Sequence, residues 1–222
     1  MFQTIKVGEI QFPHINVQSS LLHKVRGYFS TKFKDYDLIH NHNNPSQKFY
    51  YRYPAFQFKT HQHLAIFAFK EEAIEVMKAL FLQSHDICIE GESIPVTHKQ
   101  IEIREVTVGE DDQYYLYRFL SPWLPLNQEN FRQYVAMSTY KEKQDKLNSI
   151  LINNIFSFCK FAQYTVTQQL KVKSQFKEIK ANLKGYEHFA FTGEFMINIK
   201  LPDFIGLGKS SSRGYGTIIN KL

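Results

Sequence analysis

The sequence contains little cysteine, little glycine and one tryptophan, and these shortages exclude several classes of protein. Its two cysteines, Cys88 and Cys159, lie in apolar surroundings with no second cysteine nearby, which excludes a disulfide framework and a Cys-x-x-Cys motif. No apolar run reaches the roughly 20 residues of a membrane-spanning helix. The first residues alternate in polarity, so they lack the apolar core of a signal peptide. We therefore expect a cytoplasmic protein that makes no contact with a membrane.

What the chain does contain indicates a folded protein rich in aromatic rings. Of its 222 residues, 43% are apolar and 15% are aromatic, including 20 Phe and 13 Tyr. Disordered chains contain far fewer aromatic residues, and this length suffices for one large domain or two small ones. Such rings fill the cores of sheet-rich folds, and they can also stack on nucleic-acid bases.

Positive charge is concentrated at the two ends of the chain. The net charge is +6, and residues 1–60 carry 8 Lys and Arg against 3 Asp and Glu, a net of +5. Residues 61–167 carry 10 against 14, a net of −4, and residues 168–222 carry 9 against 4, a net of +5. If the ends meet in the fold, they form a basic face that attracts polyanions. Charge alone fits ordinary solvated lysines equally well.

Hydrophobic periodicity predicts two helices placed between strands in the first half. The helix at 17–33 carries Leu22, Val25 and Phe29 at helical spacing, and Ser19 or Ser20 is its predicted cap. The full prediction is a strand (2–11), this helix, a polar loop (34–47), a strand broken by Pro54 (48–59), a strand (63–69), an amphipathic helix (70–83), and strands at 86–90 and 99–108 joined across 91–95. The order β-α-β-β-α-β is that of a ferredoxin-like domain.

The second half repeats this order less completely. It begins after an acidic stretch, residues 109–113, which we expect to be a solvated linker. Its predicted elements are a strand (114–126), a helical stretch in two pieces (127–162) with Leu147, Leu151, Ile155 and Phe156 as its apolar stripe, two long strands (167–182 and 187–201) and a final strand (215–222). Only residues 202–206 remain for a second helix. We therefore predict an α+β fold of two tandem ferredoxin-like (RRM-like) domains, residues 1–110 and 111–222.

Four of the 10 glycines fall between residues 206 and 216, in the stretch FIGLGKSSSRGYGTI. A P-loop needs glycine at position 203, where this chain has Asp203, and it needs a helix afterwards, where only a strand is predicted. A dinucleotide-binding loop opens a βαβ unit, which this segment does not. The remaining interpretations are a turn-rich connection without a ligand and a loop that approaches a phosphodiester closely. The second is favoured by the repeated Gly-x-Gly pairs with basic residues between them.

The pattern G-x-G-x5-G-x-G followed by a short strand resembles the glycine-rich signature of the RAMP superfamily. Within it, the chain is similar to the CRISPR-associated endoribonucleases that cut precursor CRISPR RNA within its repeats. FLSPW, residues 119–123, also resembles the Ser-Pro element that opens the second domain of this family. The resemblance implies that the glycine segment holds RNA backbone, through Gly206, Gly208, Lys209, Ser210, Arg213, Gly214 and Gly216.

The same resemblance implies a site that cuts RNA without a metal. Such a reaction needs proton transfers, which histidine suits, and a cation for the developing phosphorane. The family commonly places a tyrosine on the first helix, a histidine in the following loop and a lysine six residues later, which implies Tyr28, His42 and Lys48 here. His42 is then the principal acid or base, Tyr28 the base or an orienting hydroxyl, and Lys48 the stabilising charge; His40 is a rival to His42. Tyr28 could instead be a core residue, and Lys48 an ordinary strand-edge lysine.

Lysines on the strand before the glycine segment are further candidates. Lys171 and Lys173 share one strand face, and a basic hairpin can track RNA phosphates. The alternative is an exposed sheet edge protected by lysine. His61 and His63 resemble a metal pair but lack further ligands, so we expect neither a metal nor another cofactor.

Taken together, these features predict a metal-independent endoribonuclease that acts on CRISPR repeat RNA and leaves 2′,3′-cyclic phosphate and 5′-hydroxyl ends. Its other predicted partners are subunits of a CRISPR effector complex, and we expect a monomer or a homodimer. Two alternatives stay open: a non-catalytic RNA-binding subunit with the same fold, and a phosphate- or nucleotide-binding regulator.

Overall fold

The computed structural model describes residues 2–40, 53–183 and 185–221, with the backbone alone at His40. The chain forms two compact units, which we describe separately. The N-terminal unit consists of Thr4–Val106 together with Ser212–Gly214, and the C-terminal unit contains Thr107–Ser211 and the strand that ends the described chain. Within the described residues, no helix is long and apolar enough to cross a membrane.

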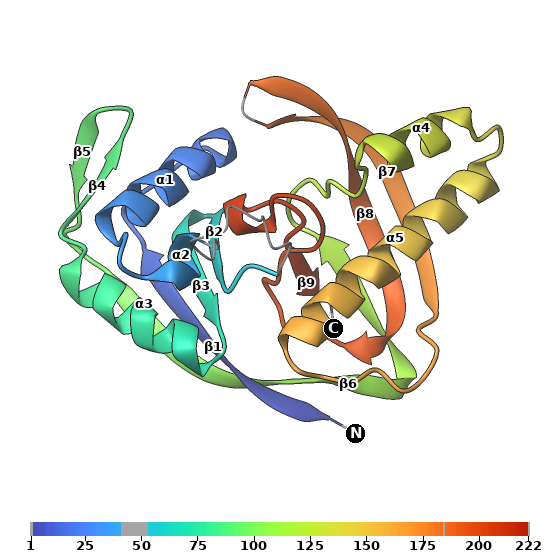
Figure 1. Ribbon diagram of the computed structural model, residues 1–222, viewed down its shortest axis with the longest axis horizontal. Helices are drawn as coiled ribbons and strands as arrows, with labels where there is room; N and C mark the ends of the chain where they lie inside the picture. Colours follow the sequence, from blue (N-terminus) through green and yellow to red (C-terminus); the bar gives the residue numbers. More distant parts are fainter. Residues whose placement is uncertain (1, 41–52, 184, 222) are drawn as a thin grey trace. The chain divides into compact units, whose positions relative to one another are not determined.

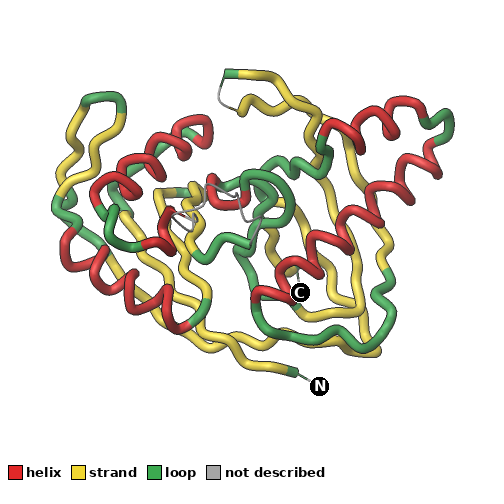
Figure 2. Tube along the Cα trace, in the orientation of Figure 1, coloured by secondary structure: helices red, strands yellow, loops and turns green. Residues whose placement is uncertain are grey.

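The N-terminal unit combines a four-stranded sheet with helices and a small separate hairpin (Figures 1 and 2). Its elements are β1 (Gln3–Phe12), the 3₁₀ turn η1 (Ser19–Leu21), α1 (Leu22–Lys32), α2 (Asp37–His40), β2 (Phe56–His61), β3 (His63–Phe69), α3 (Glu71–Gln83), β4 (Asp86–Ile89), β5 (Glu92–Pro95) and β6 (Gln100–Phe119). The strand order is β2-β3-β1-β6, and β4 pairs only with β5 among the described strands. This is the predicted ferredoxin-like arrangement with one hairpin added.

Both long helices cover the same face of this sheet. Side chains alternate along a strand, so Gly8 and Phe12 of β1 point to one face. A Cβ on Gly8 would lie 2.7 Å from the sulfur of Met77 on α3, so α3 packs closely there. The Phe29 ring of α1 lies 6.4 Å from that of Phe12 and 5.5 Å from that of Phe58. The predicted apolar faces of both helices are therefore the ones that are buried.

Two details of this unit differ from the sequence prediction. Neither Ser19 nor Ser20 caps α1; both lie in η1, and Leu21 is the N-cap residue without a side-chain hydrogen bond. Residues 91–95 are not a simple connection, since β5 lies within them and pairs with β4 through Ile87 and Ile94. In so short a segment with isolated apolar residues, the alternation of apolar and polar residues is too weak to predict a strand.

The C-terminal unit repeats the same strand order. After β6 it contains α4 (Gln128–Ala136), α5 (Tyr140–Phe161), β7 (Val172–Leu183), β8 (Tyr186–Lys200), the 3₁₀ turn η2 (Ser211–Arg213) and β9 (Ile218–Asn220). The order is β9-β6-β8-β7, with β6 between β9 and β8. The second helix of a ferredoxin-like unit is reduced, as predicted, but its remnant is the turn η2 at Ser211–Arg213 and not residues 202–206. The fold class of two tandem ferredoxin-like units is confirmed.

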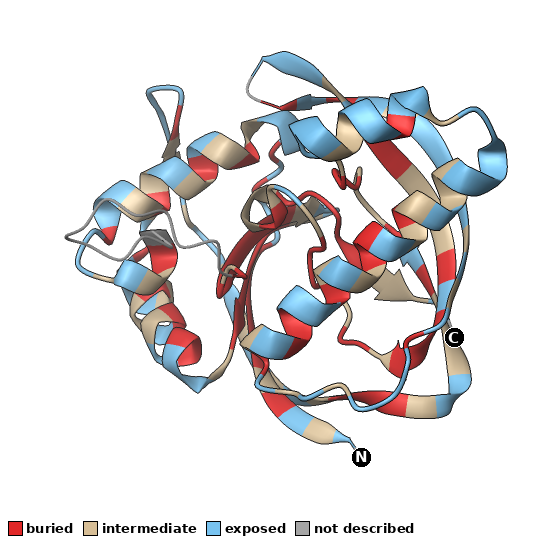
Figure 3. Ribbon diagram, turned by 45° about the vertical axis from the view of Figure 1, so that its right-hand side comes forward, coloured by how far each residue is buried: buried red, intermediate tan, exposed pale blue. Residues whose placement is uncertain are grey.

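Aromatic rings form the centre of the C-terminal core. The Trp123 ring stacks on Phe119 with centroids 5.2 Å apart and lies at the same distance from Phe176. Along α5, buried and exposed residues alternate at helical spacing (Figure 3). Leu147, Leu151 and Ile155 are buried as expected, but Phe156 is 42% exposed. Phe158 and Cys159 are buried instead, so the apolar stripe was placed wrongly at its C-terminal end.

The acidic stretch 109–113 is not a linker, contrary to the sequence prediction. It lies inside β6, where the pairing with β8 shifts register between Glu110 and Tyr115. Glu110 is only 5% exposed. Its carboxylate accepts hydrogen bonds from the backbone nitrogens of Thr167 (2.8 Å) and Gln168 (2.5 Å) and from the Tyr164 hydroxyl (2.8 Å). A buried carboxylate is tolerated because these donors replace water.

Candidate functional site

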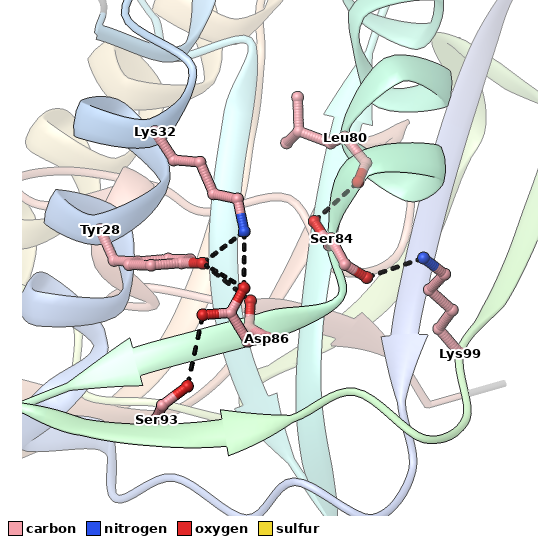
Figure 4. A network of polar contacts seen from close by, with 7 residues as sticks. All are labelled: Tyr28, Lys32, Leu80, Ser84, Asp86, Ser93 and Lys99. Carbon is pink, nitrogen blue, oxygen red and sulfur yellow. Dashed lines mark hydrogen bonds and ion pairs between the residues drawn. The ribbon is translucent and has the colours of Figure 1, made fainter.

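Tyr28 projects from α1 toward the start of β4 (Figure 4). Its hydroxyl donates to the backbone carbonyl of Asp86 at 2.8 Å, with the Asp86 Oδ1 atom at 3.3 Å. It accepts from the Nζ atom of Lys32, one helical turn later, at 2.6 Å. The side chain is partly buried, so Tyr28 is neither a core residue nor a surface residue.

Charges around Tyr28 are paired. Lys32 Nζ lies 2.8 Å from Asp86 Oδ1, and this ion pair lowers the pKa of the Asp86 carboxyl, with the hydrogen bond from Lys32 as the main cause. Burial raises the pKa of the Tyr28 hydroxyl, although Lys32 opposes this effect. At neutral pH the phenol is therefore protonated. In this arrangement it is a hydrogen-bonding group, not a phenolate base.

Of the other candidate catalytic residues, the structure describes only the backbone of His40. His42 and Lys48 lie outside the described residues. His40 is the last residue of α2, which follows α1 through the hydrogen bonds Tyr36 N to Phe33 O and Ile39 N to Tyr36 O, both 3.1 Å. Ile39 is buried, which fixes the backbone of α2 to the core. The proposed roles of His40, His42 and Lys48 stay predictions.

The glycine segment, residues 206–216, is held by the FLSPW element. Within the C-terminal unit, the Pro122 carbonyl accepts from Gly216 N at 2.9 Å and the Leu124 carbonyl accepts from Lys209 N at 3.1 Å. The Ser121 hydroxyl accepts from Thr217 N at 2.9 Å. Leu207 N also donates to Gly216 O at 2.8 Å, which closes the segment on itself. The two motifs that resemble the family are therefore parts of one structure.

Three of these glycines are required by the backbone. Gly208, Gly214 and Gly216 have φ of +82°, +84° and +63°, a region that favours glycine. A Cβ on Gly216 would lie 1.9 Å from the Leu207 carbonyl oxygen, and one on Gly208 would lie 2.8 Å from the Trp123 ring nitrogen. The glycines therefore allow close approach of the protein's own chain.

The part of the segment that solvent reaches is centred on its basic residues. Gly206, Gly214 and Gly216 are buried, whereas Lys209 is exposed and Ser210 and Arg213 are partly exposed. Any direct contact of the segment with a ligand has to be made by residues 208–213. Lys209 and Arg213 supply its positive charge.

Residues 212–214 belong to the N-terminal unit by their contacts. A Cβ on Gly214 would lie 2.5 Å from Leu22 and 3.1 Å from the Phe58 carbonyl oxygen, so the segment crosses β2 closely. Burial lowers the pKa of Arg26 on α1, and the charge of Arg213 lowers it further. Lys59, the residue after Phe58, is 3% exposed, and burial lowers its pKa to about 7. Two basic groups, Arg26 of α1 and Arg213, are thus close enough to interact where residues 212–214 meet the N-terminal unit.

The two candidate lysines before β8 are exposed. Lys171 precedes β7 and donates its backbone N–H to Asn198 Oδ1 at 2.7 Å. Lys173 lies on β7, with its Nζ atom 6.0 Å from the centre of the Tyr114 ring on β6. Both side chains are available to a ligand, and their role in RNA binding stays a prediction. Among the described residues, no group of three or more His, Cys, Asp or Glu is arranged to hold a metal ion.

Sequence reasoning missed Lys32, Asp86 and Lys59. Lys32 could have been found, because the spacing of four from Tyr28 places both on one helix face. Asp86 is 58 residues from Tyr28, and nothing in a single sequence links them. Lys59 follows apolar residues in a strand, where a lysine is ordinarily expected to be exposed.

Two tandem ferredoxin-like units with a clamped glycine segment before the last strand are the features that the resemblance to the RAMP superfamily predicts. Residues 3–107 match the model of the Cas6b N-terminal domain, and residues 109–221 match that of the Cas6b C-terminal domain. The chain belongs to the Cas6b family, which confirms the resemblance inferred from the sequence.

Solved structures and one curated protein are also similar to this chain. A crystal structure of Cas6b superposes with a TM-score of 0.91 at 30% identity and covers 98% of this chain and 100% of the other. A structure described as the CRISPR RNA processing endoribonuclease Cas6b has a TM-score of 0.79 at 28% identity, with the same coverage. An uncharacterised protein of Methanocaldococcus jannaschii is 29% identical over 144 residues, which is 64% of this chain and 97% of that protein.

Proposed function

We propose that this chain is a metal-independent endoribonuclease that cuts precursor CRISPR RNA within its repeats. The observation that supports this most is the match of both halves to Cas6b domains, together with similarity over nearly the whole chain to a structure described as a CRISPR RNA processing endoribonuclease. The basic residues of the glycine segment and the paired polar groups at Tyr28 are consistent with it.

The proposed reaction is attack of a ribose 2′-hydroxyl on the adjacent phosphorus. The 2′-oxygen forms a bond to phosphorus while the bond to the 5′-oxygen of the next nucleotide breaks. One group removes the 2′-proton and one protonates the leaving oxygen, and His42 serves as the principal acid or base, with His40 as its rival. Lys48 stabilises the phosphorane charge. The products carry a 2′,3′-cyclic phosphate and a 5′-hydroxyl.

The RNA backbone is proposed to lie along basic groups of residues 168–222. Lys209, Ser210 and Arg213 contact phosphates, while the buried glycines of the segment hold these side chains in place. Lys171 and Lys173 extend the contact along the hairpin. In this scheme residues 1–110 carry the catalytic loop and residues 111–222 carry the RNA-binding loop. Effector-complex subunits as further partners, and a monomeric or homodimeric state, remain predictions.

The test is cleavage of a radiolabelled repeat RNA by the purified chain in excess EDTA. We expect one cut per repeat, and no cut when the ribose at the cleavage site is replaced by 2′-deoxyribose, because the nucleophile is then absent. Resistance of the terminal phosphate of the 5′ fragment to phosphatase, lost after mild acid opens the ring, identifies a cyclic phosphate end. Binding of the repeat without cleavage favours the non-catalytic subunit instead, and cleavage of the 2′-deoxy substrate excludes the proposed mechanism.

A further inference from the structure

The Tyr28 hydroxyl has a limited number of hydrogen bonds to offer. A neutral phenol has one proton to donate and two lone pairs that accept. The proton is directed at the Asp86 carbonyl oxygen, 2.8 Å away, and one lone pair accepts from Lys32 at 2.6 Å. One lone pair is left for a ligand. Tyr28 can therefore accept from a ligand but has no proton left to give it.

The partners of Tyr28 are themselves fixed by the N-terminal unit. The Asp86 carboxylate accepts from Lys32 at 2.8 Å and from the Ser93 hydroxyl of β5 at 3.3 Å. Two residues earlier, the Ser84 carbonyl accepts from Lys99 at 2.8 Å, and the Ser84 hydroxyl donates to Leu80 of α3 at 2.7 Å. The acceptor of the Tyr28 proton is thus anchored from α1, α3 and the β4–β5 hairpin (Figure 4).

The local charges favour the neutral phenol. The Lys32 ammonium is shared between the Tyr28 oxygen and the Asp86 carboxylate, so its charge is already balanced by an acid. A phenolate would place a second negative charge beside that carboxylate. Tyr28 is therefore suited to accept a hydrogen bond from the RNA and poorly suited to remove a proton.

We propose that Asp86 and Lys32 are positioning residues that hold Tyr28 as a hydrogen-bond acceptor for an RNA donor beside the attacking ribose, either a nucleobase amino group or a ribose hydroxyl that does not react. The attacking 2′-hydroxyl then keeps its one proton for the base. The inference rests on the proposed ribonuclease function and deepens it, because it assigns Tyr28 the orienting role and leaves proton removal to another group. Asp86 and Lys32 act through Tyr28 and do not contact the reacting atoms.

A neighbouring ion pair offers a control that distinguishes positioning of Tyr28 from a purely structural role of these contacts. Lys24, one turn before Tyr28 on α1, forms an ion pair with Glu90 at the end of the hairpin. This pair joins α1 to the hairpin as Lys32 and Asp86 do, but it does not include Tyr28. If docking of the hairpin were all that mattered, Glu90→Ala would have the same effect as Asp86→Ala.

The experiment is a double-mutant cycle on single-turnover cleavage at saturating repeat RNA, with RNA affinity measured separately. We expect Tyr28→Phe and Asp86→Ala each to slow cleavage about ten-fold, because a misplaced nucleophile reacts less often. The double variant should cut within about two-fold of Tyr28→Phe, since Asp86 acts through Tyr28. Asp86→Asn should recover most of the rate, because its amide oxygen still accepts from Lys32. Dissociation constants should stay within about two-fold of wild type.

Several outcomes overturn the inference. A further ten-fold loss on adding Asp86→Ala to Tyr28→Phe shows that Asp86 acts independently of Tyr28. An equal loss in Glu90→Ala shows a docking role. A wild-type cleavage rate in Tyr28→Phe removes Tyr28 from the chemistry while the ribonuclease function stands. Absence of cleavage by the wild-type chain sinks the proposed function itself, and the positioning role with it. Thermal unfolding of each variant identifies losses of cleavage rate that come from misfolding. If Asp86→Ala is misfolded, the cleavage rate of Asp86→Asn tests the inference instead.

Discussion

The two ferredoxin-like units differ most in the connection between their third and fourth strands. In the N-terminal unit, α3 and the β4–β5 hairpin lie between β3 and β6. In the C-terminal unit, the glycine segment and η2 lie between β8 and β9. The first connection is held by an apolar helix face, and the second by backbone hydrogen bonds that require positive φ. The same topology is therefore stabilised by side chains in one unit and by backbone conformation in the other.

The two regions are also expected to contribute to different steps, the chemistry of cleavage and the binding of RNA. The N-terminal unit places Tyr28, Lys32 and Asp86 in fixed hydrogen bonds, whereas the segment that replaces a helix in the second half presents Lys209 and Arg213. We expect substitutions in the first set to change the rate of chemistry and those in the second to change RNA affinity. Four predictions follow from this contrast, in order of expected size.

The largest effect is expected for the histidine of the catalytic loop. His42→Ala should slow single-turnover cleavage about 10³-fold, because a positioned acid or base is lost, and leave RNA affinity nearly unchanged. The measurement is the cleavage rate at saturating RNA beside a binding isotherm. His98→Ala, which changes an exposed histidine of the same unit, is the control and should cut normally. If only His40→Ala abolishes cleavage, the assignment moves to His40 while the contrast between the units stands.

A glycine substitution should separate the two ways of stabilising a unit. Gly216→Ala places a Cβ 1.9 Å from the Leu207 carbonyl oxygen at a φ of +63°, so we expect a loss of about 3 kcal/mol in unfolding free energy. Gly27→Ala on α1 meets nothing within 4 Å and should be neutral or slightly stabilising. Urea unfolding of both variants measures the difference, and equal stabilities contradict the backbone argument.

Lys59 predicts a pH dependence of stability that belongs to the N-terminal unit. Burial lowers its pKa to about 7 from 10.5, so between these values the unfolded chain binds a proton that the folded chain does not. Stability contributed through Lys59 therefore falls as pH drops from 10.5 toward 7 and is level below that range. Lys59→Met should gain roughly 2 kcal/mol over wild type at pH 7 and lose this advantage at pH 10.5. Urea midpoints at the two pH values test this, with Lys34→Met, an exposed lysine, as the control.

The smallest effects are expected for the two basic residues of the glycine segment. Lys209→Ala and Arg213→Ala should each weaken RNA binding about five-fold at low salt and reduce the salt slope by about 0.7, the value for one phosphate contact on a single strand. Cleavage at saturating RNA should stay near wild type. Lys78→Ala on α3 is the control for the loss of one positive charge. A change in the saturated rate without a change in affinity contradicts the proposed division of work.

The fold could be predicted from the sequence where a periodic signal was strong. The apolar face of α3 and the spacing of Leu22, Val25 and Phe29 on α1 correctly predicted both helices. The small number of residues between β8 and β9 correctly predicted that the second helix of the C-terminal unit is reduced. The acidic stretch around Glu110 was wrongly predicted to be a linker, because the burial of Glu110 depends on hydrogen-bond donors more than 50 residues away in the chain. A charged residue satisfied by distant backbone groups leaves no local pattern.

The candidate site shows the same limit. The glycine segment was visible because its conformation needs particular residues at fixed spacing, as Gly208 and Gly216 show. Lys59 and Asp86 were not visible, because a strand lysine and a loop-end aspartate are ordinary in sequence and acquire their roles through packing. Residues that matter by conformation leave a local signal, and residues that matter by juxtaposition do not.

The length and pairing of strand β6 limit the insertions and deletions that this protein can accept during evolution. Its 20 residues serve first the sheet of one unit and then that of the other, with no spacer between them. Inserting or deleting one residue in a paired part of the strand would exchange its inward and outward side chains, which neither core tolerates. The irregularity between Glu110 and Tyr115 already departs from strict alternation. We therefore expect an added or lost residue in β6 to disturb the pairing with β8 least at this position.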